Sequence, residues 1–470
     1  MSFLLRCIDI TDLLDLEDSN LNVTDVTLSG NKKIVTLETA PTIHHCPVCN
    51  YRMYSRGIKT RTINHPILQD TYQLIIKLKQ RRWRCTNPIC GYEANETFNF
   101  VNKYRRTSNA TDLLIVNSFR DLSNTAVKIA ETFKTSDTHV LDVFDTYVKM
   151  ERLPLSDAIC IDEVYLDMDP RCKYVMVIQD FHTGQTIDML HSRRSNVTEP
   201  YFASIPKEER FSVKYLISDM YNPYIAYTTK YFPNAISVVD SFHVVQWLNR
   251  SLENFLRGLL REFRKRDEDA RQKRELELGR PVAHHMSDEV YILSKYNWFL
   301  LKNNDNIQYH EDHRMDRHFR YYMNTYDYER LFFDIHPDLK TFRDLKELYI
   351  RFNKRNAGNP SQASIELDEL IKTYALSDHD IFKEFSLLLY KHHEHIINSF
   401  IMVERIGDGS VYESRLSNGP IEALNRKAKD LKRSGRGYRN FDHLRNRFLF
   451  STRIDPALDG REPIHWSNEI

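Results

Sequence analysis

The sequence predicts a multidomain protein of the α/β class with a long helical segment in its second half. Its 470 residues exceed what one ordinary hydrophobic core accommodates, so roughly two to four domains are expected. Residues 20–40 alternate between apolar and polar side chains in strand fashion, and strand patterns mixed with helical ones fill residues 157–240. Residues 242–400 are instead rich in charge, leucine and tyrosine and poor in strand patterns. Sheets are therefore expected in the first half of the chain, and helices beyond residue 242.

The bulk composition restricts the classes of protein that the sequence fits. An apolar fraction of 41% and a charged fraction of 28% are typical of soluble globular proteins, and the formal net charge is only +1. A surface for nucleic acid must therefore come from local clustering of basic residues. No apolar stretch of about 18 residues is present, so no membrane contact is expected, and residues 1–6 lack the pattern of a secretion signal. We expect a cytoplasmic, nucleoid-associated protein.

Four of the seven cysteines form two closely spaced pairs within residues 1–100. Cys46 and Cys49 enclose Pro-Val, Cys85 and Cys90 enclose Thr-Asn-Pro-Ile, and a strand pattern at residues 72–79 lies between the pairs. Short cysteine turns joined by strands are typical of a zinc ribbon, in which four thiolates complete a tetrahedral Zn²⁺ site. Because all four ligands are protein side chains, this Zn²⁺ is expected to be structural. The alternative is two chance pairs in a reduced intracellular protein.

Residues 101–152 show two helical patterns, at 126–133 and 137–147, separated by a short polar turn. This length and spacing predict a helix-turn-helix, whose second helix would enter the major groove of DNA. The alternative is a pair of helices that only pack against each other. The second helix contains few basic residues, which weakens the DNA interpretation, although Arg105 and Arg106 just upstream could contact phosphate.

Residues 153–243 are expected to form the first part of a catalytic core. Three strand patterns follow one another, and helical and strand patterns then alternate; the strands are expected at residues 157–166, 173–181, 185–190, 213–218 and 235–239. This is the element order of an RNase H-like core, in which the first and fourth strands are neighbours. Asp162 and Asp219 follow apolar runs in those two strands, so we expect their carboxylates to meet. Glu163 would point to the opposite face.

The rest of the chain is expected to contain an insertion and the last core helix. Residues 244–410 are interpreted as an all-helical insertion, because roughly 160 residues are too many for a loop. Residues 411–470 would hold the last core helix and a basic C-terminal segment. Asn418-Gly419-Pro420 predicts a helix start, which places Glu422 in the first turn, where the helix dipole favours its ionised form. The alternatives are a solvated Glu422 without a catalytic role, or Glu413 in its place.

Asp162, Asp219 and Glu422 are together candidate ligands of a shared metal site. Carboxylate oxygens suit Mg²⁺ or Mn²⁺. Two such ions about 4 Å apart activate an attacking oxygen and stabilise the leaving one in phosphodiester chemistry.

Basic residues are concentrated in two parts of the sequence. A basic run ends the strand pattern before Cys85, and residues 426–447 contain nine Lys or Arg in a chain of nearly neutral charge. Such an imbalance is typical of a surface that faces phosphates. The candidate DNA-contacting residues are Arg81, Arg82, Arg84, Lys427, Lys429, Lys432, Arg433, Arg436 and Arg439.

The ordered set of these motifs resembles bacterial insertion-sequence DDE transposases of the ISL-three family over nearly the whole chain. The resemblance rests on the two cysteine pairs, Ile161-Asp162-Glu163, Ser218-Asp219-Met220-Tyr221, Phe232-Pro233-Asn234-Ala235, Asp240-Ser241-Phe242-His243, and Ser417-Asn418-Gly419 with Glu422 and Asn425. It implies an RNase H-like catalytic domain with a helical insertion and assigns Asp162, Asp219 and Glu422 as the catalytic acids. It also implies supporting roles for Asp240 and His243, with Asp240 as an alternative to Asp219 as metal ligand. Asn425 is a further supporting candidate, one helical turn after Glu422.

The function implied by the resemblance is DNA transposition. Such a protein binds the terminal inverted repeats of its own insertion sequence and catalyses metal-dependent DNA cleavage and strand transfer with Mg²⁺ or Mn²⁺, while a structural Zn²⁺ holds the ribbon. Its partners would be double-stranded DNA, both transposon ends and target, and a second copy of the chain, because two ends must be paired. The alternatives are a zinc-ribbon DNA-binding regulator derived from a transposase, and a nuclease without strand transfer.

Overall fold

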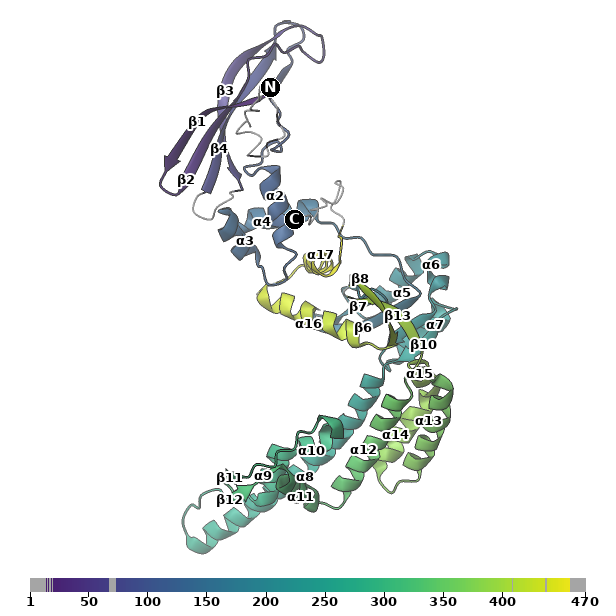
Figure 1. Cartoon of the computed structure of the whole chain (residues 1–470). Helices are drawn as coiled ribbons and strands as arrows, with labels where there is room; N and C mark the ends of the chain where they lie inside the picture. Colours follow the sequence, from purple (N-terminus) through teal and green to yellow (C-terminus); the bar gives the residue numbers. More distant parts are fainter. Residues whose placement is uncertain are drawn as a thin grey trace, which may run out of the picture. The chain divides into compact units, whose positions relative to one another are not determined.

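The computed structural model describes Leu14, Leu16, Asp18 and residues 20–66, 73–407, 409–435 and 438–456. The chain forms two compact units, one made of residues 1–151 together with the chain from Asp430 onward, and one made of residues 152–429. The predicted segment 411–470 is thus divided between the two units. Figure 1 labels most of the elements of both units. Among the described residues, no helix is long and apolar enough to cross a membrane.

The first unit contains a five-stranded sheet. Its strands are β1 (Leu21–Ser29), β2 (Lys32–Thr39), β3 (Met53–His65), β4 (Gln73–Cys85) and β5 (Glu93–Asn95). They are ordered β1-β2-β4-β3, with β5 added to β4, and β2 and β4 are parallel while the other pairs are antiparallel. In the first half of β4, alternate side chains (Leu74, Ile76 and Leu78) are buried in one cluster with Leu37 and Ile63, as expected for a half-buried strand. The strands expected around the cysteine pairs are therefore present.

The described residues of the first unit also include the helices α2 (Asn109–Ser118), α3 (Ala126–Phe133), α4 (Asp137–Tyr147) and α17 (Phe441–Thr452). The side chains of Thr125 and Ser136 cap α3 and α4, which begin and end where the helical patterns predicted. Lys134 ends α3 in the left-handed region at φ 52°, a position that favours glycine. Helix α17 packs on the same group, since the rings of Phe144 and Phe450 are 5.8 Å apart.

Arg447, on α17, corrects the interpretation of residues 426–447 as one phosphate-facing surface. Its side chain is buried, its guanidinium donates to the carbonyl of Asp121 at 2.7 Å and lies 4.8 Å from the ring centroid of Phe119. Burial also lowers its pKa to about 10. This arginine holds helices together and does not face solvent. Counting charges along the chain cannot separate such a residue from an exposed one.

The second unit is built on another five-stranded sheet. Its strands are β6 (Ala158–Asp169), β7 (Cys172–Asp180), β8 (Thr186–Leu190), β9 (Tyr215–Ser218) and β10 (Ile236–Val239), in the order β10-β9-β6-β7-β8. The β6, β7 and β8 strands are antiparallel neighbours, whereas β6, β9 and β10 run parallel. All five expected strands are present within a few residues. The helices between them are α5 (Ser195–Ser204), α6 (Lys207–Ser212) and α7 (Asn222–Lys230).

One face of this sheet is covered by an aromatic-rich layer. Phe202 of α5 and Tyr224 and Tyr227 of α7 are buried against Ile159 and Ile161 of β6. The alternation along β6 therefore directs isoleucines to this face and leaves Cys160 and Asp162 for the other. Helix α6 was missed by the sequence analysis, because its six residues are too short to display a helical repeat.

The segment between β10 and the last core helix is mostly helical. It contains α8 (Ser241–Leu278), α9 (Asp288–Tyr296), α10 (Trp298–Leu301), η1 (Asn304–Asn306), α11 (Thr325–Asp334), α12 (Asp338–Arg355), α13 (Pro360–Ala375), α14 (Asp380–Lys391) and α15 (His393–Asn398). It also contains two antiparallel hairpins, β11 (Arg314–Asp316) with β12 (Tyr321–Met323), and β13 (Met402–Gly407) with β14 (Ser410–Arg415). The prediction of an all-helical insertion is therefore wrong in this detail. Strands of three to six residues give too little alternation to be recognised in sequence.

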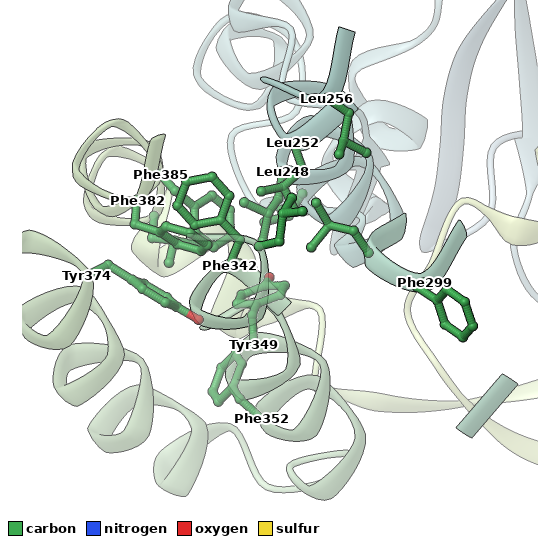
Figure 2. Packing of buried hydrophobic residues seen from close by; sticks show 14 of the residues in the cluster. Leu248, Leu252, Leu256, Phe299, Phe342, Tyr349, Phe352, Tyr374, Phe382 and Phe385 are labelled. Atoms are coloured by element: carbon green, nitrogen blue, oxygen red, sulfur yellow. The ribbon is translucent and has the colours of Figure 1, made fainter. Parts of the chain in front are cut away.

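The insertion has its own hydrophobic core, as a segment of this length requires. Figure 2 shows Leu248, Leu252 and Leu256 of α8 among the aromatic side chains of other helices. The ring of Phe385 on α14 lies 5.3 Å from Tyr349 on α12 and 5.4 Å from Tyr374 on α13. All of these side chains are almost completely buried. Helix α8 is thereby fixed to the rest of the insertion along its first half.

Helix α16 (Gly419–Ser434) follows β14 and begins where the sequence predicted. The carbonyl of Asn418 accepts the first helical hydrogen bond, from the backbone N–H of Glu422 at 3.1 Å. A stripe of side chains at helical spacing is buried along it: Ile421, Leu424, Asn425, Ala428 and Leu431. Asn425 is the polar member of that stripe, so it must find its partners inside the protein.

Candidate active site and cysteine cluster

Three aspartates hold matching positions at the edge where β6, β9 and β10 lie side by side. Cys160 pairs with Ile217, so Asp162 and Asp219 each come two residues beyond that pair. Ser218 pairs with Val239, so Asp219 and Asp240 each come one residue beyond that pair. Residues in equal register on parallel strands project toward the same face of a sheet. The expectation that Asp162 and Asp219 lie close together therefore has a structural basis in register, and Asp240 extends the same row.

Asp162 lies inside its strand, because β6 continues to Asp169 in antiparallel pairing with β7. Its carboxylate is buried and accepts two hydrogen bonds, from the backbone N–H of Glu163 and from Nδ2 of Asn425, both at 2.8 Å. Burial raises the pKa of Asp162 to about 7, and the negative charge of nearby Asp219 acts in the same direction. The site thus concentrates negative charge in a place with little water.

Asp240, His243 and Glu422 form a compact cluster of possible ligand atoms, all within 4.8 Å of one another. Asp240 caps α8 by accepting a hydrogen bond from the backbone N–H of Phe242 at 3.3 Å, which puts His243 in the first turn of that helix. Glu422 arrives from the first turn of α16. Burial raises the pKa of both Asp240 and Glu422, and the charge of Asp240 contributes to the shift at Glu422.

Asp219 is the least enclosed acid of the row. Its Oδ1 accepts a hydrogen bond from the backbone N–H of Tyr221 at 2.9 Å. In the described part of the chain, Asp162, Asp219 and Glu422 do not have ligand atoms all within 4.8 Å of one another, whereas Asp240, His243 and Glu422 do. The assignment of Asp162, Asp219 and Glu422 as the metal-binding set remains a prediction, and Asp240 stays an alternative to Asp219.

Buried polar atoms without hydrogen-bond partners indicate the kind of ligand that this site can bind. Among the described residues, Nε2 of His243 and the Oδ1 atoms of Asn418 and Asn425 are buried without a hydrogen-bond partner. Burying a polar atom without a hydrogen-bond partner costs free energy, unless a ligand binds that atom. Carboxylate oxygens and a neutral imidazole nitrogen are common ligands of divalent cations. The residues present therefore fit a divalent metal ion.

Glu163 lies on the other side of the sheet, as its position next to Asp162 predicted. Its carboxylate accepts a hydrogen bond from the hydroxyl of Tyr224 at 2.6 Å and forms an ion pair with Arg193. Both partners belong to the face covered by the helices between the strands. Glu163 is thus engaged away from the row of aspartates.

Arg415 is a site-adjacent residue that the sequence analysis missed. Its guanidinium donates to the carbonyl of Ser399 at 2.7 Å and to Oδ1 of Asn353 at 2.7 Å, and it lies 3.7 Å from the ring centroid of Phe400. These contacts hold the end of β14 to the insertion core just before α16 begins. No local pattern marks it, because all its partners are distant in sequence.

A family model described as Transposase, of the ISL-three type, matches residues 159–448 and so includes every acid of this site. The chain belongs to this transposase family. Membership makes the protein an enzyme that cleaves or transfers DNA. No curated protein matches the chain.

The four paired cysteines of this transposase come together at one end of the first unit. Their sulfur atoms all lie within 4.8 Å of one another, with 3.7 Å between Cys46 and Cys90 and 3.4 Å between Cys49 and Cys85. Zn–S bonds of about 2.3 Å give a tetrahedron whose edges are about 3.8 Å, close to these separations. The cluster is therefore compatible with a structural Zn²⁺.

The turns that carry these cysteines have matching backbone conformations. Asn50 follows Cys49 at φ 60°, and Gly91 follows Cys90 at φ 59°. Each turn is closed by a backbone hydrogen bond that the first cysteine of its pair donates. The N–H of Cys46 donates to the carbonyl of Tyr51 at 2.8 Å, and the N–H of Cys85 donates to the carbonyl of Tyr92 at 2.9 Å. A left-handed residue after the second cysteine lets the chain reverse direction and point both sulfur atoms inward.

The three arginines of β4 that are predicted to contact DNA form ion pairs with glutamates. Arg81 donates to Glu38 at 2.6 Å and to the carbonyl of Thr39, and its side chain is only 14% exposed. Arg82 and Arg84 pair with Glu93 at 2.5 Å and 3.4 Å. Arg82 is more exposed than either Arg81 or Arg84, so it is better placed than Arg81 to contact a phosphate.

The predicted contacts in the C-terminal basic segment differ in exposure. Lys427, Lys429, Arg433 and Arg439 are exposed, although Arg433 is 3.4 Å from Asp430. Lys432 is half-buried and donates to the carbonyl of Tyr438 at 2.8 Å. Arg436 lies outside the described residues.

The exposed face of α4, the second helix of the predicted helix-turn-helix, is acidic. Asp137, Asp142 and Asp145 lie on that face, and Asp142 pairs with Arg105. Three carboxylates would repel DNA phosphates, which argues against α4 as the helix that reads a major groove. The helix-turn-helix role stays a prediction.

Proposed function

We propose that this transposase binds the terminal inverted repeats of its insertion sequence and catalyses metal-dependent cleavage and strand transfer of DNA. The observation that carries the proposal is the arrangement of four acids from distant parts of the chain. Asp162, Asp219 and Asp240 share one register level on adjacent parallel strands, and the first turn of α16 brings Glu422 to Asp240 and His243. Within the described residues, no Lys or Arg forms an ion pair with these four acids, and such a group of acids is costly to fold unless it binds cations.

The strand order supports an RNase H-like core. Three antiparallel strands are followed by two parallel ones that add beside the first strand, giving β10-β9-β6-β7-β8. Helices connect the parallel strands, and the insertion leaves after β10. In this arrangement the first and fourth strands are neighbours, so acids on both contribute to one site.

We assign Asp162, Asp219 and Glu422 as the catalytic acids that hold Mg²⁺ or Mn²⁺. When bound, such ions polarise the scissile phosphate and make an oxygen nucleophile available near neutral pH. Asp240 and His243 stand next to Glu422 and would orient it or contribute ligand atoms themselves. The amide of Asn425 holds the Asp162 carboxylate in one orientation through its hydrogen bond of 2.8 Å.

Other parts of the chain would recognise and hold the DNA. Lys427 and Lys429 are exposed on α16, within two turns of Glu422, and would contact the phosphates that flank the cleaved bond. The cysteine cluster would bind a structural Zn²⁺ and stabilise the end-binding region formed by the N-terminal sheet. Because two transposon ends must be joined to one target, we propose that the chain acts as a homodimer.

The test is a cleavage and joining assay with DNA that carries the element's ends, in the presence of Mg²⁺ or Mn²⁺. Joined products support the transposase assignment, cleavage without joining indicates a nuclease, and binding without cleavage indicates a regulator. We expect Asp162→Asn, Asp219→Asn and Glu422→Gln each to abolish cleavage while binding to the ends persists. Glu413→Gln is the matched control, because Glu413 is an exposed glutamate on β14. Retained cleavage in Asp219→Asn, together with its loss in Asp240→Asn, would move the ligand role to Asp240.

A further inference from the structure

The β11–β12 hairpin carries an exposed combination of aromatic and basic side chains within the insertion. Met315 and Tyr322 face each other across the two strands and are 54% and 62% exposed. Arg314 lies on β11, and Arg317 and Arg320 lie in the connecting turn, all three exposed. Within the described part of the chain, none of these arginines has an acidic side chain within ion-pair distance. The hairpin therefore presents apolar and cationic groups to solvent together.

The hairpin is anchored by a buried carboxylate, that of Asp316, next to its turn. Asp316 accepts hydrogen bonds from the hydroxyls of Tyr291 on α9 and Tyr328 on α11, both at 2.7 Å. It also accepts backbone hydrogen bonds from His318 at 2.8 Å and Phe319 at 3.1 Å, which fix the turn. The ring of His318 stacks on Tyr291, with centroids 4.3 Å apart and planes 7° from parallel. The exposed side chains thus project from a preorganised support, which reduces the entropy lost on binding.

A cavity of about 740 Å³ lies beside the hairpin and is also lined by aromatic and basic side chains. Its aromatic walls are Tyr296 and Tyr328, whose rings are 4.2 Å apart, and Trp298. Lys295 lies over the rings of Tyr291 and Tyr296 at 4.9 Å and 5.3 Å. The cavity lining contains two acids, Asp316, which holds the turn of the hairpin, and Asp312.

The backbone at Arg320 has a conformation that is unfavourable for residues other than glycine. Arg320 has φ 60°, in the left-handed region, at the turn position where glycine is favoured. A non-glycine residue there is strained, typically by about 1 kcal/mol. An arginine at this position is therefore less favourable for folding than a glycine would be.

We propose that this hairpin and the adjoining cavity bind a single-stranded segment of the DNA substrate. Aromatic faces accept unstacked bases whatever their sequence, and arginines and a lysine interleaved with them contact the phosphates. Duplex DNA offers no exposed base faces, so the combination favours a strand whose bases are open. The proposal rests on the DNA-processing role of the family and goes beyond the proposed catalysis, since it assigns a task to a part of the insertion far from the acids in sequence.

Photocrosslinking locates the bound strand on the intact protein. A single-stranded oligonucleotide that contains 5-iododeoxyuridine is irradiated with the full-length chain without added Mg²⁺ or Mn²⁺, and crosslinked peptides are identified by mass spectrometry. We expect crosslinks within residues 291–328, in the first place at Tyr321 or Tyr322. Absence of crosslinks in that range overturns the proposal. Because no cleavage is required, this result is independent of the catalytic assignment.

The matched variants test the chemistry of binding. The triple variant Arg314→Ala, Arg317→Ala, Arg320→Gly should reduce the slope of log affinity against log salt concentration by about 2, since each phosphate contact to a single strand contributes about 0.7. Tyr322→Ala should weaken binding by about 5- to 100-fold, the range for one stacked base. The control removes three exposed basic residues of α8, Arg264→Ala, Lys265→Ala and Lys273→Ala. An equal loss in the control, or stronger binding of duplex than of single strand at the hairpin, overturns the proposal.

One single variant separates binding from folding. Arg320→Gly relieves the left-handed backbone strain, so its melting temperature should be unchanged or higher. Its affinity for single-stranded DNA should nevertheless fall. A variant that is at least as stable and binds as tightly as the wild type would contradict a phosphate contact at this position.

Discussion

Asn425 offers the sharpest test of how the active site is organised. Its Nδ2 donates to Oδ2 of Asp162 over 2.8 Å, and both side chains are buried. Asn425→Ala removes this donor and leaves a buried carboxylate oxygen unsatisfied. A hydrogen bond to a charged group contributes about 1.5–3 kcal/mol, which corresponds to about a 10- to 100-fold change in an equilibrium constant. Residues that orient metal ligands have effects of this size on metal affinity or activity.

The assay for Asn425→Ala is cleavage of end-bearing DNA as Mn²⁺ is titrated. We expect the Mn²⁺ concentration for half-maximal rate to rise by about 10- to 100-fold, because Asp162 is no longer held in one orientation. Asp430→Ala is the control: it truncates a short polar side chain on an exposed face of the same helix and should leave the Mn²⁺ dependence unchanged. Thermal unfolding of both variants checks that they are folded. An unaltered half-maximal Mn²⁺ concentration in Asn425→Ala would refute the orienting role.

Three further outcomes follow from other parts of the structure. Cys85→Ser removes one sulfur from the cysteine cluster, so purified protein should lose bound zinc and binding to the element's ends; full zinc content by elemental analysis would remove Cys85 from the ligands. Leu252→Ala should lower the free energy of unfolding of the insertion by about 3–5 kcal/mol in urea denaturation, because the fully buried leucine is surrounded by aromatic rings that cannot collapse into the space. Lys134→Gly should raise the stability by about 0.5–1 kcal/mol, since φ is 52° there, and a lower melting temperature would contradict this.

The parts of the site that could be predicted from sequence are those governed by local pattern. Asp162 and Asp219 each follow an apolar run in a strand pattern, and the order of the strands makes those two strands neighbours. The start of α16 was readable from Asn418-Gly419-Pro420, because helix caps have a strong local signature. Glu163 could be placed on the opposite face by alternation alone.

What could not be predicted depends on contacts between distant segments. The approach of Glu422 to Asp240 and His243 depends on how the insertion folds, since it separates His243 from Glu422 by well over a hundred residues. The burial of Arg447 depends on α17 packing against helices near the other end of the chain. The β11–β12 hairpin consists of strands of three residues, which is too short for an alternating pattern to be visible.

The placement of the insertion between Asp240 and Glu422 has a consequence for the timing of activity in the cell. Glu422 follows Asp162 by 260 residues, and the ribosome adds about 5–20 residues per second. About 10–50 s therefore pass between the synthesis of Asp162 and that of Glu422, the last of the proposed acidic ligands. Truncated products that end inside the insertion keep the N-terminal region that we propose binds DNA, but they lack Glu422. Such fragments would occupy the element's ends without cutting them, and would restrain the intact enzyme.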